Sequence, residues 1–166
     1  MPVNVTFSKT AGGAAIADSL QGGGSGLDHG NVTNGSSTGT QEVFIRHDGA
    51  NEITDCKFWI AQYSGVYGGG ASASLDLAEI LSWGASNEGL RIDPNPDSTF
   101  TSFKTGVGDS SINAIALSGG DGGTNPDDIG AGVNTTSIKL RVSVPPSEDT
   151  AGYRQFDFKM DYTYTS

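Results

Sequence analysis

The sequence predicts an all-β protein, folded as an antiparallel β-sandwich, and two observations support this class. Near the C-terminus, residues 138–144 and 156–164 alternate between apolar and polar side chains. A period of two places alternate side chains on opposite faces of an extended strand, so each run buries one face and exposes the other. The 25 glycines, with 35% hydrophobic residues, suit many short strands joined by irregular loops rather than a helical bundle.

The two alternating runs are the centre of the predicted core. The apolar set of the first run is Ile138, Leu140, Val142 and Val144. The second run requires Phe156, Phe158 and Met160 to be buried together. Burial of each such side chain stabilises the fold by roughly 1.5–3 kcal/mol. Phe158→Ala is therefore predicted to be among the most destabilising substitutions.

Two interpretations describe how these runs meet. Asp149 is followed four residues later by Tyr153, which resembles the tyrosine corner of immunoglobulin-like sandwiches. In that interpretation the two runs lie on opposite sheets and face each other across the core. The alternative is a hairpin, in which the basic residues of the first run pair with the aspartates of the second. The sequence leaves both open.

The N-terminal part begins with a short strand, in which Val3, Val5 and Phe7 alternate with polar residues. Residues 11–40 then lose this periodicity and are rich in glycine and serine. Such a segment is either a flexible linker or an extended arm that becomes ordered on a neighbouring subunit. The protein is accordingly predicted to have a glycine-rich N-terminal arm.

Residues 41–47 and 53–63 are the next predicted strands, and Asp48-Gly49 indicates a turn between them. In the first of these strands, Val43 and Ile45 share the apolar face. In the second, Cys56 and its alternate neighbours occupy one face and Trp59 occupies the other. A large apolar residue on both faces predicts that the second strand is central in its sheet.

Residues 74–83 form the one predicted helix, because Leu77, Ile80 and Leu81 share a helical face. A strand here would bury Glu79. Three short strands follow at residues 90–92, 100–105 and 112–117, and a glycine- and aspartate-rich loop spans 119–132. The whole chain, 1–166, is predicted to be one domain, with the strand and arm in 1–40 and the main sandwich in 41–166.

Composition argues against several kinds of partner. Nine basic and nineteen acidic residues give a net charge of −10, which repels phosphate backbones and anionic lipid. No apolar run is long enough to span a membrane, and the first residues lack the pattern of a secretion signal. Cys56 is the one cysteine and is interpreted as a small core residue of a protein made in a reducing compartment.

No group of residues predicts a catalytic, cofactor or metal site. His29, next to Asp28, and His47 have no partner at metal-ligand spacing and are interpreted as loop and strand-end residues. The segment Asp121–Asp128 could offer carboxylates to calcium, but its spacing fits no known calcium motif and a solvated acidic loop is favoured.

Aromatic and acidic residues leave two further hypotheses open. The aromatic residues of a possible sugar-stacking platform are Trp59, Tyr63, Tyr67 and Trp83, although such residues are more often part of a core. Nineteen carboxylates could also contain a pair suited to glycoside hydrolysis, but no pair stands out.

Two resemblances refine the prediction. Residues 27–56 carry an acid, spaced glycines, a Gly-Ser pair and an Asp-Gly turn, and they resemble the opening strands of immunoglobulin-like modules. Residues 42–56 and 146–157 resemble small proteins from the structural modules of tailed bacteriophages. The first implies an immunoglobulin-like sandwich, and a jelly-roll sandwich is the alternative within the predicted fold class.

The second resemblance implies a virion component made in the host cytoplasm. It would be a capsid decoration protein or an accessory subunit of the neck, tail or baseplate. Its partners would be capsid or tail subunits, and it would be a homo-oligomer or present in many copies, without nucleic acid or membrane contact. A carbohydrate-binding module is the alternative function.

Overall fold

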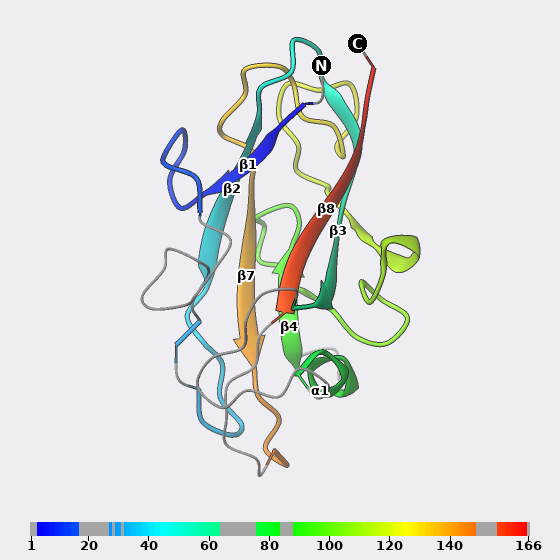
Figure 1. Cartoon of the computed structure of the whole chain (residues 1–166). Coiled ribbons are helices and arrows are strands. Elements are labelled where there is room, and N and C mark those ends of the chain that lie inside the picture. The colour runs from blue at the N-terminus through cyan, green and yellow to red at the C-terminus, as the bar shows by residue number, and fades with distance from the viewer. Residues whose placement is uncertain are drawn as a thin grey trace.

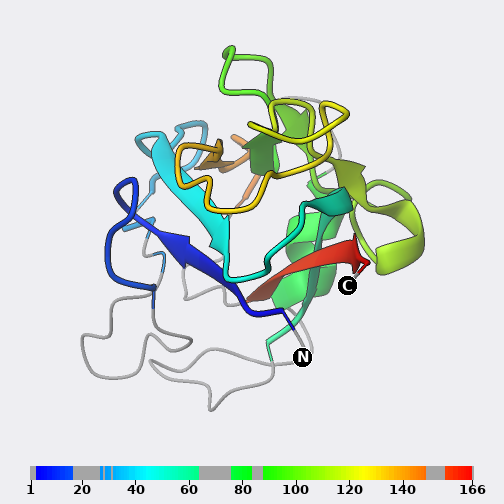
Figure 2. The ribbon, with the colours of Figure 1, turned by 90° about the horizontal axis from the view of Figure 1, so that it is seen from above.

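Two antiparallel sheets stack face to face around the hydrophobic core, which confirms the predicted all-β sandwich (Figures 1 and 2). The structure is a computed structural model that describes residues 3–16, 27, 29–30, 32–63, 76–83, 88–148 and 156–165. The strand order is β1-β2-β7-β4-β5 in the five-stranded sheet and β6-β3-β8 in the three-stranded sheet.

The elements have the following bounds. The five-stranded sheet contains β1 (Val5–Ser8), β2 (Gln41–His47), β4 (Gly89–Asp93), β5 (Thr101–Ser102) and β7 (Ser137–Ser143). The three-stranded sheet contains β3 (Ile53–Gln62), β6 (Ile115–Ala116) and β8 (Phe156–Tyr164). The helical elements are α1 (Asp76–Ser82) and a 3-10 turn, η1 (Ser111–Asn113).

The strand order follows the immunoglobulin arrangement. In that fold strands A, B, E and D form one sheet in the order A-B-E-D, and strand C pairs with strand F in the other. Here the order β1-β2-β7-β4 corresponds to A-B-E-D, and β3 pairs with β8 as strand C pairs with strand F. The start of β1 also lies beside the end of β8, where the Tyr162 hydroxyl donates to the carbonyl of Val3 at 2.8 Å.

The two C-terminal runs lie on opposite sheets. β7 pairs with β2 and β4, whereas β8 pairs with β3. The hairpin interpretation is therefore wrong. Ile138 and Leu140 of β7 are buried, as predicted. Tyr153, on which the tyrosine-corner interpretation rests, lies outside the described residues.

The predicted faces of β2 and β3 are confirmed. Val43 and Ile45 of β2 are buried, and so are Cys56, Phe58 and Ile60 of β3. β3 lies between β6 and β8, so it is central, as its two-sided apolar pattern predicted. β8 stands at the end of that order, and its apolar side chains pack against the core while remaining half-buried.

The predicted helix is present and closes one end of the sandwich (Figure 1). Ile80 is buried, and Leu77 and Leu81 pack beside it against the core. Residues 74–75 of the expected span lie outside the described residues. Among the helices that the structure describes, none has the length and apolar character needed to cross a membrane.

Two of the later strands are shorter than predicted. Within 100–105 only Thr101–Ser102 pairs as a strand, because the chain then enters a turn in which Lys104 and Val107 bridge to each other. Within 112–117 the strand covers Ile115–Ala116, and the residues before it form the 3-10 turn. The side chain of Ile112 is consequently 92% exposed.

The described parts of the glycine-rich segment contact their own sandwich. The amide of Ile16 donates to the carbonyl of Phe7 at 2.7 Å, so residues 9–16 fold back on β1. Farther along, the amide of Thr38 donates to the carbonyl of Val142, and the hydroxyls of Ser37 and Ser143 lie 2.7 Å apart. Residues 35–38 therefore extend along the end of β7 instead of projecting as an arm.

Candidate functional site

A groove opens where β3 is irregular. The pairing of β3 with β8 slips between Thr54 and Lys57, so β3 has one residue more than its partner at this point. Asp55 takes a left-handed conformation there, with φ of 54°. Such a bulge changes the direction of side chains and is often found beside binding sites. The groove has a volume of about 580 Å³ and is lined by Asp55, Lys57, Asp127, Asp161 and Tyr162, among others.

Cys56 also lines the groove. Its side chain is fully buried, and the Sγ lies 3.9 Å from the carbonyl oxygen of Ile53. Burial raises the pKa of this thiol to about 12, and the negative charges of Asp128, Asp127 and Asp55 add to the rise. A nucleophilic cysteine needs a depressed pKa. Cys56 is therefore a core residue, as predicted, and not a nucleophile.

We expect Cys56 to react with iodoacetamide only after unfolding. At pH 8, a thiol with a pKa of about 12 holds on the order of a thousandfold less thiolate than one with a pKa of 9.0. Because the folded pKa is raised, the contribution of this thiol to stability is complete below about pH 9 and is lost as the pH rises toward 12. Mass spectrometry of labelling with and without urea checks this, and rapid labelling of the folded chain would contradict it.

The acidic loop at residues 119–132 is fastened to β3. The amide of Ile53 donates to the carbonyl of Ile129, and the amide of Ile129 donates back, at 3.0 and 2.9 Å. At the bulge, the amide of Cys56 donates to the carbonyl of Asp127 at 3.0 Å. Because Ile53 also pairs with Tyr164 of β8, the loop lies along the opposite edge of β3, and it places Asp127 in the wall of the groove.

The three aspartates of this loop point to different places. The buried carboxylate of Asp128 accepts from the amide and the side chain of Asn125 at 2.7 and 2.8 Å. The carboxylate of Asp121 accepts from the Thr135 hydroxyl at 2.8 Å. Asp127 faces the groove instead. Within the described ranges no three His, Cys, Asp or Glu side chains come together as a metal site.

His47 fixes the same loop from the other sheet. Its Nε2 lies 3.1 Å from the carbonyl oxygens of both Ile129 and Gly130, and its Nδ1 accepts from the amide of Gly49 at 3.2 Å. An Nδ1 that accepts leaves the proton on Nε2, which then donates to the two carbonyls. His47 is a structural residue in a buried strand end. Asp28, the neighbour of His29, lies outside the described residues.

The two tryptophans of the possible sugar-stacking platform lie in different surroundings. Trp83 belongs to the core cluster, and its Nε1 donates to the Glu148 carboxylate at 3.1 Å. Trp59 lies on the other face of β3, opposite to the buried face that carries Phe58. Tyr63 follows β3, and Tyr67 lies outside the described residues.

The sequence did not predict one further group, on the outer face of the five-stranded sheet. Arg91 of β4 and Arg141 of β7 are direct cross-strand partners, and both guanidinium groups lie over the ring of Phe100. The outward direction of each arginine could be predicted from the sequence, because each one alternates with aliphatic residues. The pairing register that brings the two together could not be read from the sequence.

A scan against protein-family models, a search of the curated proteins and a search of the solved structures each gave no match for this chain.

Proposed function

We propose that the chain is a non-enzymatic structural protein of a tailed-bacteriophage virion, foremost a capsid decoration protein that binds the particle through protein–protein contacts. The observation that carries the proposal is the use of polar side chains in the long loops. Asp128, Asp121 and His47 are all engaged in holding the 119–132 loop in place. Loops fixed in this way suit a rigid surface that docks on a neighbour without rearrangement.

Other loops are held by carboxylates in the same manner. Buried Asp93 accepts from the amides of Asn95, Asp97 and Ser98, the last at 2.7 Å. A hydrogen bond from the amide of Gly106, followed by one from the side chain of Asn113, lowers the pKa of Asp109. These carboxylates stabilise turns by accepting hydrogen bonds, which supports a scaffold role.

The charge of the surface indicates what kind of neighbour fits. The net charge is −10, and the groove beside β3 places Asp55, Asp127 and Asp161 around one lysine, Lys57. A basic patch on a capsid or tail subunit would complement this region. Because many copies would bind one symmetric particle, weak individual contacts would suffice for retention.

Sedimentation of native particles tests the proposal. The expected result is that the chain co-sediments with purified particles in a stoichiometric copy number, measured by quantitative mass spectrometry. Its recovery only from the soluble lysate would overturn the proposal. A cryo-electron microscopy map of the same particles would separate a capsid position from one in the neck, tail or baseplate.

The carbohydrate-binding alternative is less well supported, because Trp83 belongs to the core, whereas Trp59 is on the face of β3 opposite to its buried residues. A glycan array with and without a chelator tests it directly. Binding to a defined glycan would favour this alternative, and no binding in either condition would exclude it.

A further inference from the structure

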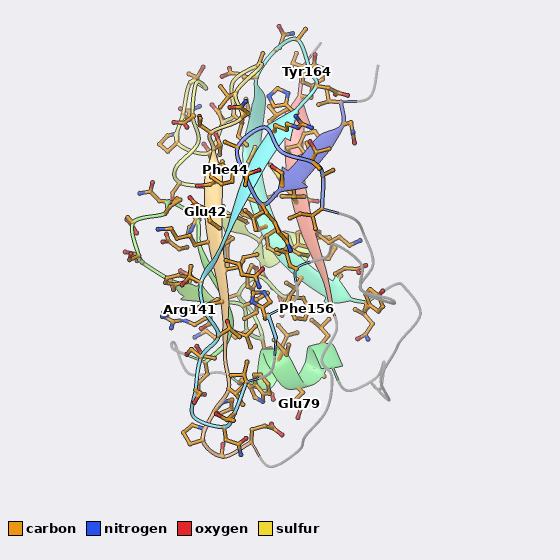
Figure 3. All side chains as sticks on the ribbon, turned by 90° about the vertical axis from the view of Figure 1, so that its left-hand side faces the viewer. Glu42, Phe44, Glu79, Arg141, Phe156 and Tyr164 are labelled. Carbon is orange, nitrogen blue, oxygen red and sulfur yellow. The ribbon has the colours of Figure 1, made fainter. Side chains whose placement is uncertain are left out.

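Two arginines lie side by side on the outer face of the five-stranded sheet. Arg91 and Arg141 are cross-strand partners in the β4–β7 pair. Their neighbours along the strands, Ile92 and Leu140, are buried in the core, so the arginines project from the opposite face. The guanidinium carbons lie 5.4 and 4.1 Å from the centre of the Phe100 ring. Figure 3 labels Arg141 below Glu42 and Phe44 along this sheet.

The positive charge of this pair is uncompensated within the described part of the chain. The Nε atoms of Arg91 and Arg141 are buried and have no hydrogen-bond partner there. Like charges directly opposite each other destabilise a sheet. Burial, followed by the charge of Arg141, lowers the pKa of Arg91. The Phe100 ring stabilises each cation only modestly at a partly exposed site.

The adjacent row of the sheet does not supply the missing anion. In that row, Glu42, Lys139 and Asp93 are neighbours across β2, β7 and β4. The Glu42 carboxylate accepts from the Ser137 hydroxyl at 2.7 Å, and Asp93 is held by the backbone amides of its own turn. Lys139 donates to the carbonyl of Pro96 at 3.2 Å.

We propose that Arg91 and Arg141, resting on Phe100, form a binding site for a carboxylate presented by another protein. Two guanidinium groups offer planar forks of N–H donors that match a carboxylate in geometry and charge. A carboxylate on the solvent side of the two guanidinium groups would reduce the repulsion between the two cations.

A carboxylate fits this chain better than a phosphate polymer does. A protein with a net charge of −10 repels nucleic acid and anionic lipid, which carry many charges. A single Asp, Glu or C-terminal carboxylate brings one charge, and the rest of its chain can be neutral or basic. The inference rests on the proposed function only in naming a neighbouring virion subunit as the source of that carboxylate.

The test is a titration of the full chain, labelled with ¹⁵N, in which the Nε–Hε resonances of both arginines are followed. Sodium acetate is the probe, with sodium chloride as the balancing salt at constant ionic strength. We expect both resonances to shift saturably, with a dissociation constant on the order of millimolar. No saturable shift would overturn the proposal. Saturation by inorganic phosphate at lower concentration than by acetate would also overturn it and assign the site to phosphate ligands.

Variants separate the site from a general salt effect. Arg141→Gln is expected to weaken the response of the Arg91 resonance to acetate at least about tenfold, and Arg141→Lys to weaken it less. Arg46→Gln is the matched control, because Arg46 lies on the same sheet face and its Nε already donates to the Thr6 hydroxyl at 3.1 Å. An unchanged response in the folded Arg141→Gln variant would contradict the assignment.

The particle experiment then distinguishes this inference from the proposed function. If the natural chain does not co-sediment with particles, the proposed function fails while the acetate result stands. If the natural chain and Arg141→Gln co-sediment equally, the proposed function stands, and a virion neighbour as the source of the carboxylate is excluded.

Discussion

Replacing Phe158 by alanine is expected to lower the free energy of unfolding by about 3 kcal/mol. The ring is half-buried on β8, but it contacts aromatic residues from both sheets. It stacks on Phe58 with ring centres 5.4 Å apart and meets Phe7 and Phe103 edge-on at 5.9 and 6.1 Å. Removal of the ring leaves a cavity between the sheets and ends all three ring contacts. Urea denaturation followed by tryptophan fluorescence measures the change.

Two comparisons show whether the loss comes from this aromatic cluster. Ile112→Ala removes a side chain that is 92% exposed, and it should change stability by less than about 0.5 kcal/mol. Phe158→Leu keeps most of the volume and should cost roughly half as much as the alanine substitution. A loss below about 1 kcal/mol for Phe158→Ala would mean that the sheets do not depend on this ring.

The strands with strong alternation were predictable because each buries one face. The buried residues of β2 are the ones that the period of two selects, and the same holds for Cys56, Phe58 and Ile60 of β3 and for Ile138 and Leu140 of β7. The alternation does not decide whether β7 and β8 lie on opposite sheets, since the same pattern suits a hairpin and a sandwich. The order of the strands is decided by long-range pairing, which no local pattern encodes.

Short elements and sites were harder to predict for a related reason. β5 and β6 have two residues each, too few for a period to be visible. The Arg91–Arg141 pair depends on the register between two strands fifty positions apart in the chain. The acidic loop resembled a solvated segment, yet Asp128 is buried and bonded within it. An aspartate whose carboxylate accepts hydrogen bonds from its own turn cannot be told in the sequence from one that faces water.

Gly120→Ala is expected to lower the free energy of unfolding by about 2–3 kcal/mol. A Cβ at residue 120 would overlap the carbonyl oxygen of Asp128 and lie 3.1 Å from the carbonyl oxygen of Pro126. Both are backbone atoms, and the amide of Gly120 already donates to the Pro126 carbonyl at 2.8 Å, so neither can swing aside. The substitution should therefore open the 119–132 loop and release its bonds to β3. Urea denaturation measures the loss, and hydrogen exchange at the amides of Ile53 and Cys56 locates it.

Gly39→Ala is the matched control for this substitution. Gly39 is exposed, and a Cβ there would meet nothing within 4 Å. Its substitution should leave stability unchanged or raise it by up to about 1 kcal/mol, because alanine restricts the unfolded chain. If Gly120→Ala behaved like Gly39→Ala, with exchange at Ile53 and Cys56 unaltered, the loop would not be held as tightly as a docking surface requires. If hydrogen exchange in Gly120→Ala became fast at these two amides alone, the loop would open as a unit while the sandwich persists.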